Sequence, residues 1–229
     1  RFKMNNVLVI APHADDEVLG CGGSIYKHYL NGDNVSVAIM TNAFKGAPEI
    51  FSKKYINDLR NEAIKAHKIL KVSDTIFFDF PAPKLNEYPL YKIANDINKL
   101  IIKKKIDTLY IPHRGDLHKD HEAIYDASLV ASKPLPSQKV KRIFVYETVS
   151  ETEWGDPINS SLFVPRYFNV INKSILNKKL KSMKCYKSQL KNTPNPRSLK
   201  NLENLASVRG AIVGHKYAES FDIVREINN

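Results

Sequence analysis

Short apolar, β-branched segments alternate with longer amphipathic segments over the first two thirds of the chain. The apolar segments have the length of buried strands and predict strands at Val7–Ala11, Val35–Met40, Thr75–Phe78, Thr108–Ile111 and Arg142–Tyr146. The segments between them predict helices at Glu17–Leu30, Asn57–Leu70, Tyr91–Lys104 and His121–Ser132. Strands and helices that alternate in this way form a parallel sheet covered on both faces. We therefore expect an α/β fold, with a Rossmann-like, mostly parallel sheet and helices on both faces.

The pattern loosens after Tyr146, where glycine and proline interrupt the apolar runs. We expect one or two further strands there, near Leu162–Val164 and Phe168–Val170. Two further helices are expected at Lys173–Leu190 and Leu199–Val213, separated by the helix-breaking stretch Thr193–Pro196. Neither a repeat period nor a linker divides the sequence, so residues 1–229 are expected to form a single domain.

The composition is that of a globular protein, with 43% hydrophobic and 26% charged residues. Its two cysteines, Cys21 and Cys185, cannot form a disulfide framework and lack the spacing of a thiolate zinc site. The polar start carries no secretory pattern, and the run Val7–Ala11 is too short to cross a bilayer. These features favour a cytoplasmic location without integral membrane association.

The formal charge of +11, from 35 Lys and Arg against 24 Asp and Glu, would attract anionic partners. The basic residues are spread along the chain, and no aromatic-interleaved basic ribbon typical of nucleic-acid binding occurs. We therefore expect no nucleic-acid partner, while an anionic small-molecule substrate and a homo-oligomer stay open.

The first polar cluster, His13-Ala14-Asp15-Asp16-Glu17, directly follows the first predicted strand. If the chain turns into a helix near Asp15, His13 and Asp16 can converge on one point with Asp15 beside them. Imidazole and carboxylate together suit zinc, or iron in the same geometry. Alternatively, the three acidic residues merely stabilise the N-terminus of the helix, although this leaves His13 unexplained.

The second cluster follows the predicted strand Thr108–Ile111 and has His118 and His121 two residues apart, with Asp116 and Asp120 interleaved. One histidine can complete a His-Asp-His metal set that leaves a position open for water. The other can be oriented by an aspartate to act as an acid or electrophile. Because ligands bind beyond the carboxyl ends of strands in such sheets, the two clusters predict one site for metal-assisted hydrolysis.

These two motifs resemble those of the LmbE-like, PIG-L family of zinc N-deacetylases, which carry a His-Pro-Asp-Asp-Glu motif and a His-x-Asp-His motif. The resemblance implies that His13, Asp16 and His121 bind zinc and that Asp15 is the general base. It also implies that His118 assists the tetrahedral intermediate and the departing amine, with Asp120 orienting its imidazole. Alanine at position 14, where proline is usual, removes no functional group.

The resemblance extends over most of the chain, through Arg60-Asn61-Glu62, Tyr146-Glu147-Thr148, Trp154, Arg209-Gly210 and Tyr217–Phe221. It implies that Arg60 reaches the substrate. His113 and Arg114 are close enough in sequence to line the rim of the site. Tyr146 and Trp154 are candidates for a sugar-stacking wall, although packed aromatic side chains are the default for both.

The expected activity is therefore removal of an N-acetyl group from an amino sugar or sugar conjugate, including a nucleotide sugar, with Zn²⁺ or Fe²⁺ as cofactor. Two alternatives remain: a metal-dependent phosphoesterase, which usually needs more carboxylates to hold two metals, and a basic nucleotide- or nucleic-acid-binding module. Asp15 argues against the binding module, since a pure binding protein needs no base beside a metal.

Overall fold

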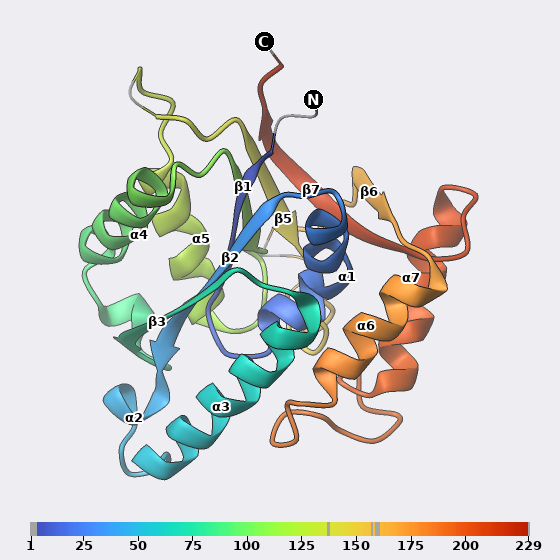
Figure 1. Ribbon diagram of the computed structural model, residues 1–229. Helices are drawn as coiled ribbons and strands as arrows, with labels where there is room; N and C mark the ends of the chain where they lie inside the picture. The colour runs from blue at the N-terminus through green and yellow to red at the C-terminus, as the bar shows by residue number, and fades with distance from the viewer. Residues whose placement is uncertain (1–3, 137, 157, 159–160, 229) are drawn as a thin grey trace.

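The structure is a computed structural model that describes residues 4–136, 138–156, 158 and 161–228. Its seven-stranded sheet has the order β3-β2-β1-β4-β5-β7-β6 (Figure 1). The strands β1 to β5 run parallel to one another, whereas β7 is antiparallel to β5 and to β6. Their bounds are β1 Asn6–Ala11, β2 Asn34–Asn42, β3 Asp74–Pro81, β4 Thr108–Pro112, β5 Arg142–Tyr146, β6 Tyr167–Val170 and β7 Ala218–Glu226.

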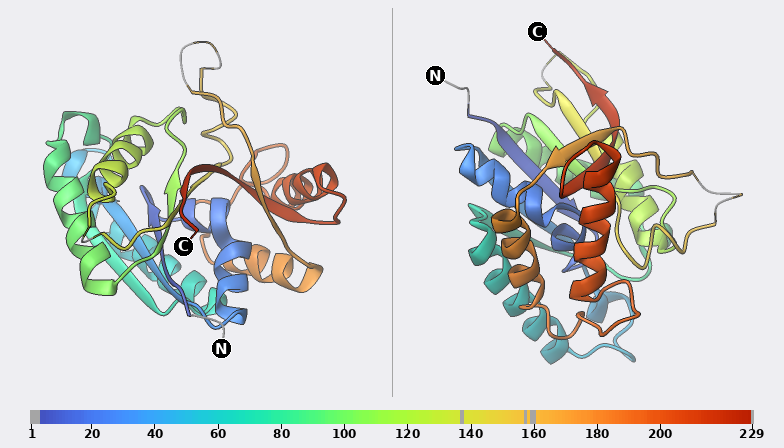
Figure 2. Two further views of the ribbon diagram at one scale, coloured as in Figure 1. Left: turned by 90° about the horizontal axis from the view of Figure 1, so that it is seen from above. Right: turned by 90° about the vertical axis from the view of Figure 1, so that its right-hand side faces the viewer.

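Helices cover both faces of the sheet, and Figure 2 shows α4 and α5 on one side and α6 and α7 on the other. Successive side chains of β1 point to opposite faces of the sheet, which explains the two layers. Val7 and Val9 belong to the apolar cluster with α1, α3 and α7, while Leu8 and Ile10 belong to the cluster with α4 and α5. The longer helices are α1 Asp16–Leu30, α3 Lys53–Leu70, α4 Leu90–Lys104, α5 Lys119–Ala131, α6 Lys173–Met183 and α7 Leu199–Ile212. In the described part of the chain, none of the helices is long and apolar enough to cross a membrane. The predicted fold class is confirmed.

The five strands and four helices expected before Tyr146 are present, with small shifts at their ends. The helix α3 begins at Lys53 rather than Asn57, because the Ser52 hydroxyl accepts a hydrogen bond from the Tyr55 N–H at 3.1 Å and caps the helix. A four-residue helix, α2 Ala43–Gly46, and a 3-10 turn, η1 Leu85–Glu87, were not predicted.

The region after Tyr146 departs from the prediction in three places. Residues 162–164 form no strand, and Leu162 and Val164 project outward at 62% and 50% exposure. The helix expected to reach Leu190 ends at Met183, because the chain turns so that the Tyr186 side chain enters the core. The strand β7 was not predicted, because its buried first half contains the polar residues Glu219 and Ser220.

The central pairing of the sheet brings the two polar clusters together. The strand β1 pairs in parallel with β4, with Val7 opposite Thr108 and Val9 opposite Tyr110. The loops that leave the carboxyl ends of these two strands are therefore neighbours at one edge of the sheet, where open α/β sheets bind their ligands.

Candidate active site

Side chains from both loops converge at this edge. His13 lies in the loop after β1, Asp15 is the residue before α1, and Asp16 is the first residue of that helix. His118 precedes α5, and its Nδ1 accepts a hydrogen bond from the Asp120 backbone N–H at 3.1 Å. His121 follows in the first turn of α5.

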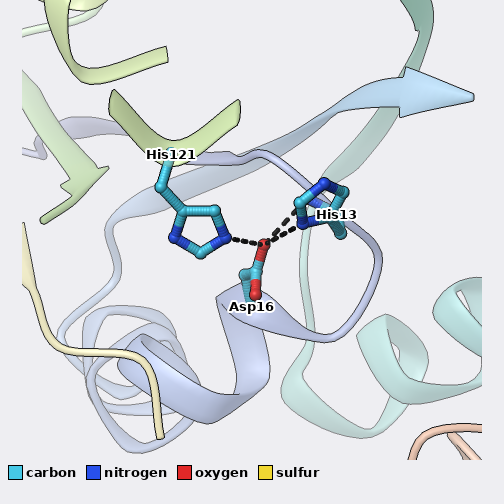
Figure 3. Close-up of side chains that lie close together, drawn as sticks. All are labelled: His13, Asp16 and His121. Carbon is cyan, nitrogen blue, oxygen red and sulfur yellow. Dashed lines mark hydrogen bonds and ion pairs between the residues drawn. The ribbon is translucent and has the colours of Figure 1, made fainter. Parts of the chain in front are cut away.

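His13, Asp16 and His121 face one point (Figure 3). His13 Nδ1 lies 3.4 Å from Asp16 Oδ2, and His121 Nε2 lies 3.3 Å from the same oxygen. Asp16 and His121 are fully buried, whereas 26% of the His13 side chain is exposed. The triad thus offers two imidazole nitrogens and a carboxylate, with access from the side of His13.

Two atoms of this triad lack the partners that buried polar atoms require. In the described part of the chain, Asp16 Oδ1 has no hydrogen-bond partner, and His121 Nε2 has only its 3.3 Å contact with Asp16 Oδ2. Leaving such atoms unsatisfied costs about 1–3 kcal/mol each. Burial lowers the pKa of His13, but its hydrogen bonds with Asp120 and Asp16 outweigh burial and raise it to about 9. The site therefore attracts positive charge, and a divalent cation with nitrogen and oxygen ligands fits it.

Each histidine of the triad is oriented by a carboxylate on its other ring nitrogen. His121 Nδ1 lies 2.7 Å from Asp116 Oδ2, and Asp116 Oδ1 accepts a hydrogen bond from the Thr152 hydroxyl at 2.6 Å. His13 Nε2 lies 3.1 Å from Asp120 Oδ2. Carboxylates in this position fix the ring and increase the basicity of a metal-binding imidazole. No specific role for Asp116 was predicted from the sequence.

Asp120 therefore lies differently from its sequence-based expectation. It was expected to orient His118, but the Asp120 carboxylate is 3.9 Å from His118 Nδ1 and forms its hydrogen bond with His13. Burial, together with the nearby His13 and His121 rings, lowers the pKa of His118 to about 4. Because His118 Nδ1 accepts the backbone bond, we assign the proton of the neutral ring to Nε2.

Asp15 occupies a strained backbone position with φ 124° and ψ −27°. Its N–H donates to Glu17 Oε2 at 3.1 Å, and Glu17 Oε1 in turn contacts His67 Nε2 at 3.1 Å and the Tyr186 hydroxyl. Non-glycine residues at positive φ persist where their surroundings over-determine them, often at functional sites. The buried Glu17 network thus fixes the direction in which the Asp15 side chain projects.

Arg197 is a residue of the site that sequence reasoning missed. Its Nη1 lies 3.1 Å from Asp15 Oδ2, and its Nε donates to the Ser150 hydroxyl at 2.7 Å. Burial raises the pKa of Asp15 to about 8, and the Arg197 guanidinium opposes that rise. Arg197 follows the stretch Thr193–Pro196, which carries only a helix-breaking signal, so no local pattern pointed to it.

A cavity of about 200 Å³ lies beside the triad, with His13, Asp15, His118 and Arg197 in its wall. Arg60 lines this cavity as well, although its Nη2 donates to Asp79 Oδ1 at 2.7 Å and to the Phe78 carbonyl at 3.0 Å. Much of the remaining lining is apolar and comes from Ile39, Ala43, Phe51, Tyr55, Ile56 and Leu59.

The other two expected substrate-binding residues lie away from this cavity. His113 is buried, contacts the Ser161 carbonyl through Nε2 at 2.8 Å, and lines a separate cavity of about 610 Å³. Arg114 forms ion pairs with Asp126 at 2.9 Å and with Glu122 at 3.1 Å on α5. The largest of these three hollows, of about 1060 Å³, lies at the amino ends of β1, β4 and β5. Cavity size alone therefore does not locate the chemistry.

Comparison with known proteins agrees with this geometry. A family model described as GlcNAc-PI de-N-acetylase (PIG-L) matches residues 8–132. The uncharacterized deacetylase YaiS of Escherichia coli K12 is 30% identical over 190 residues, which cover 81% of this chain and 92% of YaiS.

Solved structures share the fold at lower identity. The N,N′-diacetylchitobiose deacetylase of Pyrococcus horikoshii superposes with a TM-score of 0.76 at 22% identity, covering 96% of this chain and 84% of that one. GalB, the 4-carboxy-2-hydroxymuconate hydratase of Pseudomonas putida KT2440, gives 0.73 at 18% identity and covers 99% of both chains. Because one fold supports both deacetylation and hydration, the fold alone does not decide the reaction.

Fold and site together define an α/β enzyme with a buried His-Asp-His centre. The chain belongs to the GlcNAc-PI de-N-acetylase (PIG-L) family, which confirms the resemblance seen in its motifs.

Proposed function

We propose that this protein hydrolyses the N-acetyl group of an amino sugar or sugar conjugate, releasing acetate and a free amine. The observation that carries the proposal is the pair of unsatisfied buried atoms, Asp16 Oδ1 and His121 Nε2, beside the carboxylate of Asp15. Membership of a deacetylase family supports the same reaction. A cytoplasmic location and a homo-oligomeric state stay predictions from the sequence.

His13, Asp16 and His121 would bind the metal, with Zn²⁺ as the proposed ion and Fe²⁺ as the alternative. When bound, such an ion polarises a carbonyl group and lowers the pKa of water to about 7. The carboxylates of Asp116 and Asp120 would fix the two imidazole rings in their ligating orientation.

Asp15 is the proposed general base. Its buried carboxylate accepts the proton of the attacking water and delivers it to the leaving amine. A pKa raised by burial suits both halves of this transfer, while Arg197 favours the ionised form that the first half needs. The Glu17 network keeps the carboxylate directed at the reacting amide.

His118 is the proposed electrophile. Its lowered pKa makes the ring neutral at pH 7, so the Nε2–H donates a hydrogen bond to the oxygen of the amide as negative charge develops there. Preorganised donors of this kind contribute about 3–4 kcal/mol to transition-state stabilisation. Of the two roles that the second motif left open, acid or electrophile, a neutral ring favours the electrophile.

The geometry gives the phosphoesterase alternative little support. In the described residues, both candidate metal groups, His13-Asp16-His121 and His13-His118-Asp120, include His13. Without a second group independent of this histidine, the site favours a single ion over the ion pair that two-metal phosphoesterases use.

Acetate release from a panel of N-acetylated sugars and nucleotide sugars tests the proposal. Activity should disappear on chelation and return with Zn²⁺ or Fe²⁺. The variant Asp15→Asn should retain the metal and lose activity by about 10²–10⁴-fold. Chelator-resistant activity, or full activity of Asp15→Asn, would refute the mechanism.

A further inference from the structure

His118 and Glu151 separate the cavity beside the triad from a second, open cavity of about 480 Å³, because both residues line both. The first cavity, at about 200 Å³, is smaller than the roughly 300–1,000 Å³ of a typical small-molecule site. A substrate larger than an acetylated sugar must therefore extend out of it. The second cavity lies directly beside the proposed electrophile.

The wall of the second cavity carries the single tryptophan of the chain. Trp154 is 52% exposed, and Leu117 in the same wall is 56% exposed. Because both side chains are exposed within one concave site, both are available to a ligand. Tyr146, the other candidate for a stacking wall, is fully buried, and its hydroxyl donates to the Ile10 carbonyl at 2.9 Å. Of the two aromatic candidates for a stacking wall, Trp154 is therefore accessible to a ligand and Tyr146 is not.

Polar groups suited to hydroxyl recognition line the same cavity as the indole. Asn86 and Glu87 line the cavity and are exposed, and within the described chain neither side chain has a hydrogen-bond or ion-pair partner. Both residues belong to the 3-10 turn η1, which is tied to the site because the Leu85 N–H donates to Asp120 Oδ1 at 3.0 Å.

A backbone hydrogen bond also holds two of the loops that line the cavity. The Leu117 N–H donates to the Glu151 carbonyl at 3.1 Å and joins the two loops that carry Leu117 and Trp154. The cavity offers little to an anionic group, since Glu87 and Glu151 both line it and Lys119 pairs with Glu122 at 3.0 Å.

We propose that this cavity binds a pyranose ring joined to the N-acetylated sugar, so that the substrate is a disaccharide or a larger saccharide. A pyranose has an apolar C–H face, which matches the indole of Trp154, and hydroxyl groups at its rim, which match Asn86 and Glu87. The assignment rests on the proposed function, because it places the reacting sugar at Asp15 and His118.

Intrinsic fluorescence tests the subsite directly, because Trp154 is the only tryptophan. N,N′-Diacetylchitobiose should give a saturable blue shift at a concentration at least tenfold below that required for N-acetylglucosamine. Uridine diphosphate should give none. The titration is repeated with Asp15→Asn so that turnover does not change the ligand.

A missing response to the disaccharide, an equal response to the monosaccharide, or a response to uridine diphosphate alone would overturn the subsite. A disaccharide response without any acetate release would instead leave the subsite intact and reject the proposed function.

Calorimetry on variants separates a binding role from a structural one. Trp154→Ala should weaken disaccharide binding at least tenfold and leave monosaccharide binding unchanged, and Trp154→Phe should recover most of the loss. Tyr91→Ala is the matched control, since Tyr91 is a 70% exposed aromatic residue of α4 that lines neither cavity. Equal weakening for both sugars in Trp154→Ala would contradict the proposal.

Discussion

Breaking the buried ion pair between Lys179 and Glu219 on one side should destabilise the fold strongly. Lys179 Nζ lies 2.6 Å from Glu219 Oε1, and the two side chains are only 5% and 3% exposed. Glu219 also accepts hydrogen bonds from the N–H groups of Gly23 and Ser24, at 2.8 Å and 2.6 Å. The pair therefore joins the middle of α1 to α6 and β7.

Replacing Glu219 with glutamine leaves the Lys179 ammonium buried without its counter-charge. Breaking a buried pair on one side costs about 3–5 kcal/mol, a large fraction of the roughly 5–15 kcal/mol that stabilises a typical domain. Lys179→Met should cost less, because Glu219 keeps its bonds to Gly23 and Ser24. The double variant should cost less than the sum of the two single changes.

Urea unfolding followed by circular dichroism, with and without chelator, measures these free energies. Asp58→Asn is the control, because the exposed Lys54–Asp58 pair should contribute almost nothing. A loss below about 1 kcal/mol for Glu219→Gln, or strict additivity in the cycle, would refute the reasoning, since a buried, coupled pair gives neither result.

Three further changes probe the site and the pH dependence of stability. Asp116→Ala should weaken zinc binding about 10–100-fold by removing the acceptor of His121 Nδ1; competition with a chromogenic chelator measures this, and unchanged affinity would contradict it. His118→Ala should keep zinc and lower kcat about 10²–10³-fold; metal analysis beside kinetics checks it, and loss of the metal would show that His118 is a ligand. Burial raises the pKa of Asp33, but bonds from His28 and Asn5 outweigh it and hold the pKa below 3.8. Asp33 therefore stabilises the fold above that pH and loses this contribution as pH falls through the lower folded value, so acid unfolding of Asp33→Asn should depend less on pH between about 5 and 2.

The fold could be predicted where burial and local periodicity agree. The strand β1 is buried from Val7 to Ala11 and β4 is buried along its whole length, and most of both strands appears in the sequence as an apolar run. The strand β7 lacks such a run, because Glu219 is satisfied inside the protein by Lys179, a residue 40 positions away. At Leu162–Val164 the apolar residues have no neighbouring strand and remain largely exposed.

The same distinction explains which site residues could be predicted. His13 and Asp16 lie three positions apart, and one turn of chain brings them together. Arg197 lies 182 positions from Asp15 and reaches it only through the packing of α6 against α1 and of α7 against α6. The partner of Asp120 also depends on tertiary structure, since the choice between His118 and His13 is decided by the orientation of two loops.

The sequence places three consecutive carboxylates at the start of a helix, and the structure gives each one a different partner. Asp16 contacts His13 and His121, Asp15 pairs with Arg197, and Glu17 contacts His67 and Tyr186. Glu17 also accepts a hydrogen bond from the Asp15 N–H. The alternative that the acidic residues stabilise the start of the helix therefore applies in part to Glu17. It does not extend to Asp15, whose side chain makes no capping bond. A carboxylate needed only to stabilise the helix would cap it, whereas Asp15 is turned by its strained backbone towards the cavity and His13, where a general base has to lie.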